Sequence, residues 1–280
     1  DNPKIRLAWQ SMNNCTKLSG NKAGEKFIKT DAESSTKINV MRVYEGIHRD
    51  NFLKYVKAYG TKNSGWPDCG NTGTPTHDLM EAADVYMRAD THKNGPWSSN
   101  PGGSDSASTE YLGCRKNFHI VLTDGGWNGT ERQTTPRNYD GDETKWPSNI
   151  PTTTASQRRL YQDIESQTTL ADWAFYSWAK PLKSDSELTG SISPDNDYRS
   201  APTTETFENR VTKAKATLEK FWNPKFNPAT WPHLVTFTIG FSEDSIPHQN
   251  HNSSGTKIGD IVKPTSELPY GFDGSFAEYA

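Results

Sequence analysis

The sequence predicts an α/β protein with a mostly parallel central sheet and helices on both faces. Two apolar runs, Phe118–Leu122 and Leu234–Phe241, have the length and composition of strands buried in a parallel sheet. Helical patterns alternate with these runs, and that alternation favours a parallel arrangement. The 280 residues contain no internal repeat, and their polar excursions look like loop insertions on one scaffold, so we interpret 1–280 as a single domain.

The N-terminal half is expected to begin with a helix, a strand and a second helix. Pro3 suits the first turn of a helix whose apolar residues run to Met12. Alternation over Lys37–Tyr44 predicts a strand. Asp50 is then expected to cap a short helix, whose apolar face would consist of Phe52, Leu53, Val56 and Tyr59.

The C-terminal half is expected to hold two helices and the second apolar strand. Apolar residues surround the cylinder of a helix near Leu170–Trp178, which predicts a largely buried helix with Asp172 as a surface or capping residue. Helical spacing predicts an amphipathic helix over Phe207–Trp222, with the apolar positions Val211, Ala214, Leu218 and Phe221. Polar stretches at about 90–113, 126–165 and 182–206 are interpreted as loop insertions. Within the second stretch, Asn138–Asp142 is similar to the start of a calcium loop. The Glu that would close such a loop is missing, which favours a solvated turn.

Two oxygen-bearing residues stand at positions typical of a metal site. Asp124 directly follows the first apolar strand, and open α/β sheets bind ligands just outside the carboxyl ends of their strands. Upstream, Thr74 or Thr76 is expected to cap a helix that has Leu79 and Tyr86 on its apolar face. Hydroxyl and carboxylate oxygens are ligands that Mg²⁺ prefers, so a threonine at the start of this helix and Asp124 have the chemistry of metal ligands. The alternatives are a plain helix cap for Thr74 and a plain turn for Asp124.

Four stretches carry a resemblance to a known family: Gly73–Pro75, Cys114–Asn128, Leu170–Ala174 and Trp222–Phe241. In this order they resemble the N-terminal region of PilY/PilC-type proteins from the tip of bacterial type IV pili, which is a von Willebrand factor A-like, Rossmann-type domain. The resemblance covers most of residues 3–241. It implies a metal-ion-dependent adhesion site that contains Thr74 and Asp124 and takes Mg²⁺, Mn²⁺ or Ca²⁺.

The sequence departs from the family in one respect. The adhesion site of the family also needs Asp-x-Ser-x-Ser after the first strand, and no such motif occurs in the 280 residues. We therefore expect the domain to be N-terminally incomplete, with its first strand supplied from upstream of Asp1. Because Mg²⁺ is coordinated by six ligands, residues 1–280 alone are expected to bind it weakly or not at all. A bound metal is expected only where the upstream motif is present.

The three cysteines, Cys15, Cys69 and Cys114, have no zinc or redox spacing. In an exported protein a Cys69–Cys114 disulfide is expected, and Cys15 would then be free or paired outside the chain. In a cytosolic protein all three would be unpaired.

Composition and resemblance together favour a binding module. The net charge of −3, without clusters of Lys and Arg, gives no reason to expect nucleic acid, and no apolar run has the length of a membrane span. The resemblance implies adhesion, pilus assembly and twitching motility, with minor pilins or the pilus tip complex, a host-surface or extracellular ligand, and a downstream domain of the same chain as partners. It places the protein outside the cell, at the pilus tip or bacterial surface, after export through the periplasm.

Two other functions are considered. One is a vestigial, metal-free A-type domain with a structural role in pilus biogenesis. The other is a hydrolase that uses Asp124 with His119 or His77. The chain has no Gly-x-Ser-x-Gly elbow, P-loop or His-Glu-x-x-His motif, so we do not expect an enzyme.

Overall fold

The computed structural model describes residues 4–10, 28, 38–59, 75–102, 110–123, 136, 139–152, 168–208, 215–223 and 225–240. The chain divides into two compact units. Unit 1 comprises residues 1–115, 127–130 and 182–191, and unit 2 comprises residues 116–126, 131–181 and 192–280. The single-domain interpretation of 1–280 stays a prediction.

Unit 1 begins with a short antiparallel strand pair, β1 (Arg6–Leu7) and β2 (Arg42–Val43). The pairing extends beyond the strands, since Tyr44 N–H donates to the carbonyl of Ile5 at 2.9 Å and Trp9 N–H to that of Asn39 at 3.0 Å. The predicted N-terminal helix is therefore wrong, because these main-chain groups bond across to another segment instead of along a helix. The strand predicted over Lys37–Tyr44 is confirmed only at β2.

Helix α1 (Gly46–Tyr59) follows β2 and starts earlier than the sequence predicts. It begins at Gly46, whose φ of 51° suits glycine, so Asp50 lies inside the helix and is not its cap. The buried face is set by Trp9, whose ring contacts those of His48, Phe52 and Tyr55. Leu53 and Val56, predicted on the apolar face, are instead exposed.

Helix α2 (Thr76–Arg88) is confirmed, and Leu79, Met80, Tyr86 and Met87 are buried along it. Pro75 occupies the N-cap position without a side-chain hydrogen bond, so Thr76 is the first helical residue and not the cap. The indole N–H of Trp97 donates to the carbonyl of Met87 at 2.8 Å and fastens the stretch after the helix to its last turn. The 3₁₀ helix η2 (Asp185–Glu187) also belongs to unit 1.

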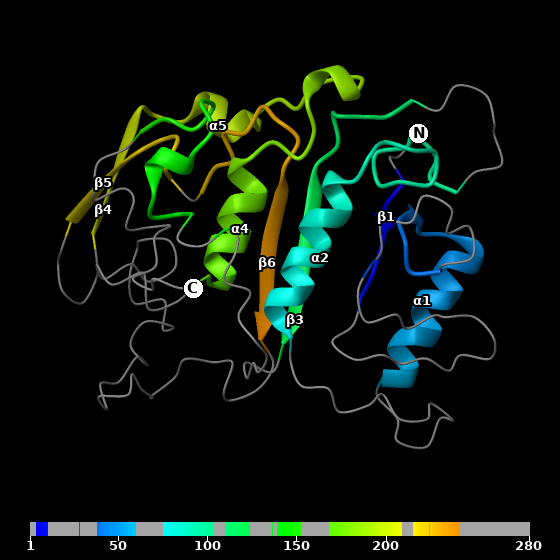
Figure 1. The fold of residues 1–280 in the computed structure, drawn as a ribbon. Coiled ribbons are helices and arrows are strands. Elements are labelled where there is room, and N and C mark those ends of the chain that lie inside the picture. The colour runs from blue at the N-terminus through cyan, green and yellow to red at the C-terminus, as the bar shows by residue number, and fades with distance from the viewer. Residues whose placement is uncertain are drawn as a thin grey trace, which may run out of the picture. The chain divides into compact units, whose positions relative to one another are not determined.

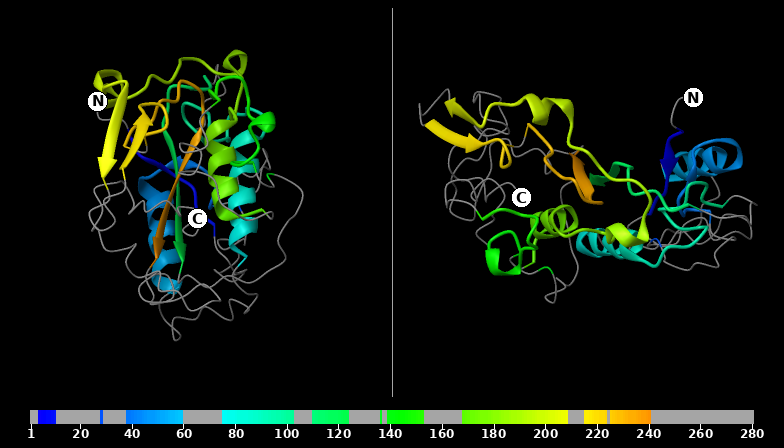
Figure 2. Two further views of the ribbon diagram at one scale, coloured as in Figure 1. Left: turned by 90° about the vertical axis from the view of Figure 1, so that its left-hand side faces the viewer. Right: turned by 90° about the horizontal axis from the view of Figure 1, so that it is seen from above.

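Unit 2 contains the parallel pair that the sequence predicts. β3 (Asn117–Thr123) pairs in parallel with β6 (Leu234–Gly240), residue by residue from Asn117 opposite Leu234 to Thr123 opposite Gly240. Helix α4 (Leu170–Ala179) packs against β6 and runs beside it in Figure 1, and Figure 2 shows the same elements from two other sides. Both predicted strands and the buried helix are confirmed, but the parallel sheet of the described residues has two strands only.

The predicted helix over Phe207–Trp222 is wrong. The chain instead forms β4 (Thr204–Glu208) and β5 (Lys215–Glu219), an antiparallel pair. The hydroxyls of Thr206 and Thr217 lie 2.8 Å apart across this pair. Threonine and aromatic residues favour a pleated strand, and here that preference outweighs the helical spacing of Leu218 and Phe221.

Two short helices complete the described part of unit 2, η1 (Glu143–Lys145) and α5 (Asn196–Ser200). A membrane span requires a longer and more apolar helix than any found in the described part of the chain.

Candidate functional site

The candidate metal ligands are next to the ends of β3 and α2 in the sequence. β3 ends at Thr123, so Asp124 is the next residue after its carboxyl end, and Thr74 stands two residues before α2. Thr74 and Asp124 themselves lie outside the described residues, so their mutual arrangement is not part of the described structure. The metal pair therefore stays a prediction. Within the described ranges, no group of three His, Cys, Asp or Glu side chains could hold a metal ion.

The predicted disulfide is described at one end only. Cys114 is exposed, next to Gly190 in unit 1, and Cys69 lies outside the described residues. The Cys69–Cys114 pairing stays a prediction.

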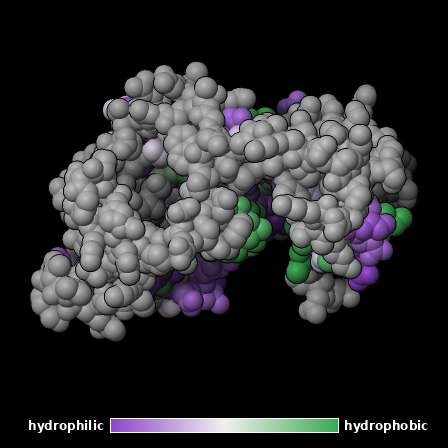
Figure 3. All heavy atoms as spheres, turned by 90° about the horizontal axis from the view of Figure 1, so that it is seen from below, coloured by the Kyte–Doolittle hydropathy of each residue, from purple (hydrophilic) through white to green (hydrophobic). Residues whose placement is uncertain are grey.

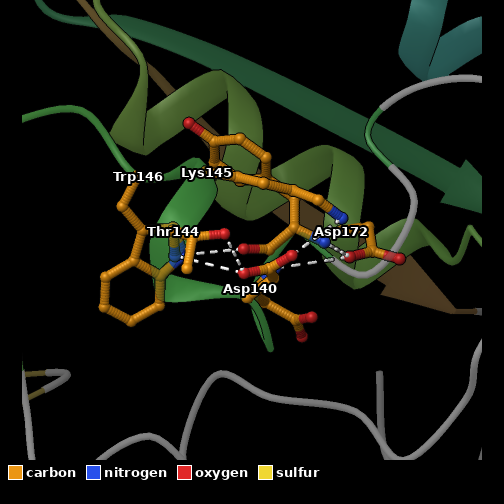
Figure 4. A network of polar contacts seen from close by, with 7 residues as sticks. Asp140, Thr144, Lys145, Trp146 and Asp172 are labelled. Atoms are coloured by element: carbon orange, nitrogen blue, oxygen red, sulfur yellow. Dashed lines mark hydrogen bonds and ion pairs between the residues drawn. The ribbon is translucent and has the colours of Figure 1, made fainter.

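Asp172 links two separate segments of unit 2 (Figure 4). It closes a capping box at the start of α4, in which its backbone N–H donates to Thr169 Oγ1 and its carboxylate accepts from the N–H of Thr169. The same carboxylate accepts from the backbone N–H of Tyr139 at 2.6 Å and of Asp140 at 3.4 Å. Asp172 is fully buried, so the predicted capping role is confirmed and the surface role is wrong.

The segment held by Asp172 has a defined local structure (Figure 4). Asp142 caps η1 by accepting from the N–H and the hydroxyl of Thr144, which lowers the pKa of its carboxyl. The indole N–H of Trp146 donates to the carbonyl of Tyr139 at 2.6 Å. Tyr139 and Asp140 are buried, so the described part of the stretch interpreted as a solvated turn is an anchored loop.

His119 lies on β3 opposite Thr236 of β6. Its Nδ1 and the hydroxyl of Thr236 are both buried and have no hydrogen-bond partner among the described residues. Burial lowers the pKa of His119 to about 4, so the imidazole is neutral at pH 7. These properties match the role of a sheet residue. Asp124 lies outside the described residues, so its pairing with His119 stays a prediction.

The β3–β6 pair has one apolar face that is open. Phe118, Ile120 and Leu122 of β3 and Phe237 and Ile239 of β6 are each between 48% and 59% exposed, whereas Val121 and Leu234, on the other face, are buried. Because strand side chains alternate between faces, the exposed set and the buried set lie on opposite sides of the strand pair. Apolar side chains are also visible at the surface seen from below (Figure 3).

Sequence reasoning missed this face although the pattern contained it. Asn117, His119, Thr236 and Thr238 alternate with the apolar residues, which indicates two unlike faces and not a strand buried on both sides. We call Phe118, Ile120, Leu122, Val235, Phe237 and Ile239 the apolar sheet face.

Comparison with known proteins gives three similar chains, each a type IV pilus biogenesis factor PilY1 of Pseudomonas aeruginosa. The PilY1 of strain PAO1 is 30% identical over 239 residues, that of strain PAK 30% over 235, and that of strain UCBPP-PA14 27% over 236. The aligned region is 84% of this chain but 16–17% of each relative, so the chain spans about a sixth of their length. No protein-family model and no solved structure matches the chain. The chain is thus similar to one segment of PilY1.

Proposed function

We propose that the chain is a binding module of a protein that acts in type IV pilus biogenesis. The observation that carries this proposal is the similarity to PilY1 over 84% of the chain. In this function the module lies at the pilus tip or the bacterial surface, outside the cell. Its partners are minor pilins or the tip complex, an extracellular or host-surface ligand, and a downstream domain of the same protein.

The binding site proposed for this module is metal-dependent. Thr74 and Asp124 supply two oxygens to Mg²⁺, and an acidic group of the partner completes the coordination together with water. Support comes from the parallel pairing of β3 with β6, because a parallel sheet binds ligands beyond its carboxyl edge and Asp124 follows β3 directly. Two oxygens are too few for a stable site, so we propose that the Asp-x-Ser-x-Ser motif implied by the resemblance adds further ligands before the partner's acid binds.

The test is a calorimetric titration with Mg²⁺ and Mn²⁺ of a polypeptide extended upstream of Asp1. The Asp124→Ala variant is measured in parallel, with Asp185→Ala, in the exposed turn η2, as the matched control. We expect binding in the parent and in Asp185→Ala, and none in Asp124→Ala. Equal binding in all three would remove Asp124 from the site.

A second function has one structural observation in its favour. The apolar sheet face is the kind of surface that proteins bury against another domain. A metal-free domain with a purely structural role in pilus biogenesis would use that face and leave Asp124 as a turn residue. Absence of metal binding by the extended polypeptide would favour this function over adhesion. We propose no enzymatic activity.

A further inference from the structure

Three arginines of unit 1 converge on the backbone of residues 94–99. Arg6, on β1, donates from Nη1 to the carbonyls of Pro96 at 2.6 Å and Ser98 at 3.3 Å. Arg115 donates from Nη1 to the same carbonyl of Ser98 at 2.8 Å and from Nη2 to that of Ser99 at 3.1 Å. Two guanidinium groups therefore share one carbonyl oxygen.

Arg42, on β2, approaches the same backbone segment. Its Nη1 donates to the carbonyls of Met41 at 2.7 Å and Asn94 at 3.2 Å. The side chain lies against Gly102, where φ is +80° and where any Cβ would collide with the Arg42 side chain. Glycine at this position thus both satisfies the backbone and leaves room for the guanidinium.

Arg6 and Arg42 carry positive charge in a half-buried setting. Burial, together with the nearby charge of Arg115, lowers the pKa of Arg6 to about 10, while the phenol of Tyr86 acts in the opposite sense. Burial likewise lowers the pKa of Arg42. Among the described residues no acid forms an ion pair with Arg6 or Arg42, whereas Lys4, Arg88 and Lys183 of the same unit are each bonded to a carboxylate.

The hydrogen bonds to the carbonyls of residues 94–99 explain only part of this arrangement. A guanidinium carries five N–H donors, and the described contacts of Arg6 and Arg42 use Nη1 alone. Half-buried cations are costly when no anion lies beside them, and neighbouring cations also repel one another. Neutral donors such as Gln would bond the same carbonyls without that cost.

We propose that Arg6, Arg42 and Arg115 form a binding site for a small oxyanion, a phosphate or a carboxylate. The planar guanidinium fork matches both groups with two parallel N–H···O bonds. Nε and Nη2 of Arg6 and Arg42 supply these donors, and Arg115 adds charge through its position on the Ser98 carbonyl. The carbonyls of residues 94–99 hold Nη1 of Arg6 and Arg42 in place, so little side-chain freedom is lost on binding.

The test measures anion binding by residues 1–280 with inorganic phosphate and, separately, with citrate as the carboxylate probe. Thermal unfolding is followed at constant ionic strength against chloride, and dissociation constants come from calorimetry. The variants are Arg6→Gln and Arg42→Gln. Arg49→Gln, at an exposed position of α1, removes the same charge elsewhere. We expect each of the first two changes to weaken binding about tenfold or more, and Arg49→Gln to leave it unchanged.

The two probes also identify the oxyanion, because the probe with the lower dissociation constant shows whether the site binds phosphate or carboxylate groups more tightly. If Arg6→Gln does not fold, Arg42→Gln alone carries the comparison, and Arg6→Lys, which keeps the charge but loses the fork, should bind with intermediate strength. The proposal would be overturned if phosphate and citrate raised the unfolding temperature no more than chloride does. It would also be overturned if the parent, Arg6→Gln, Arg42→Gln and Arg49→Gln all bound the probes with the same dissociation constant. Neither result affects the Mg²⁺ titration, because that experiment depends on Asp124.

Discussion

The carboxylate of Asp172 accepts a 2.6 Å hydrogen bond from the backbone N–H of Tyr139, a residue 33 positions earlier in the chain. The same side chain caps α4 through Thr169. One buried acid therefore fixes both the start of the helix beside β6 and the loop that precedes η1. Its carboxylate has backbone N–H donors on both oxygens, which is how a buried charge is tolerated in a protein interior.

Asp172→Ala should lower the free energy of unfolding by about 3 kcal/mol, because a helix cap is lost and buried N–H groups are left without acceptors. Urea unfolding followed by tryptophan fluorescence measures the change. Asp185→Ala, at an exposed position, should change stability by less than about 0.5 kcal/mol. Equal effects of the two substitutions would show that Asp172 does not anchor the loop.

The lowered pKa of His119 predicts a loss of stability in acid. The folded pKa is about 4, below the ordinary value of 6.5, so between these values the unfolded chain binds a proton that the folded chain excludes. Stability should therefore fall as pH drops from 6.5 and level off near pH 4, with a total contribution of roughly 3 kcal/mol.

The variant His119→Gln isolates this contribution. The pKa values of His48, His92 and His233 are also lowered, and these residues add to the slope in both proteins. Subtracting the two curves of unfolding free energy against pH leaves the part due to His119. Parallel curves between pH 4 and 6.5 would contradict the low pKa of this imidazole in the folded chain.

Neighbouring residues of β3 should respond differently to the same polar substitution. Ile120 is 57% exposed, so Ile120→Thr should change the free energy of unfolding by less than about 0.5 kcal/mol. Val121 is 6% exposed, and Val121→Thr places a hydroxyl in the core, which should cost about 1–3 kcal/mol. Chemical denaturation measures both. The reverse order would mean that the apolar sheet face is the covered one.

The β4–β5 pair can be tested by crosslinking. Thr206 lies opposite Thr217, and cysteines at these two positions should form a disulfide in a background where the native cysteines are serine. In a helix, eleven residues would separate the two positions by about 16 Å, far beyond the ~7 Å that a disulfide spans. Mass spectrometry measures the yield. The offset pair Thr204→Cys/Thr217→Cys should crosslink less, and equal yields would contradict the register.

Local sequence was sufficient for the elements whose signal lies within a few residues. The β-branched and aromatic run before Asp124 predicted β3, and the apolar cylinder of Leu170–Trp178 predicted α4. It failed at Leu218, where helical spacing also fits a strand pair specified by Thr206 and Thr217. It failed again at Arg6–Leu7, because only the distant partner Arg42–Val43 makes that segment a strand.

The position of Asp124 directly after a strand was predictable for the same reason, whereas its role as a metal ligand stays a prediction. A strand end followed by an acid is a local pattern, so Asp124 could be singled out. The partners of Asp172 could not, since Tyr139 and Asp140 lie in a stretch without periodicity. The arginine cluster could not be predicted either. Its members are brought together by β1–β2 pairing and by backbone carbonyl acceptors, and neither can be inferred from residue types.

The parallel pair also dictates the order in which the chain acquires its structure. The side-chain amide of Asn117, at the start of β3, reaches the carbonyl of His233, 116 residues further on. A contact of such separation must wait for the second strand to be synthesised, and closing so long a loop is slow compared with forming α2 or α4. Until Leu234–Gly240 has been synthesised, β3 lacks its partner strand, although α2 and α4 can already form. A nascent or truncated chain that stops before β6 therefore carries an unpaired apolar strand, and such a strand is prone to aggregate.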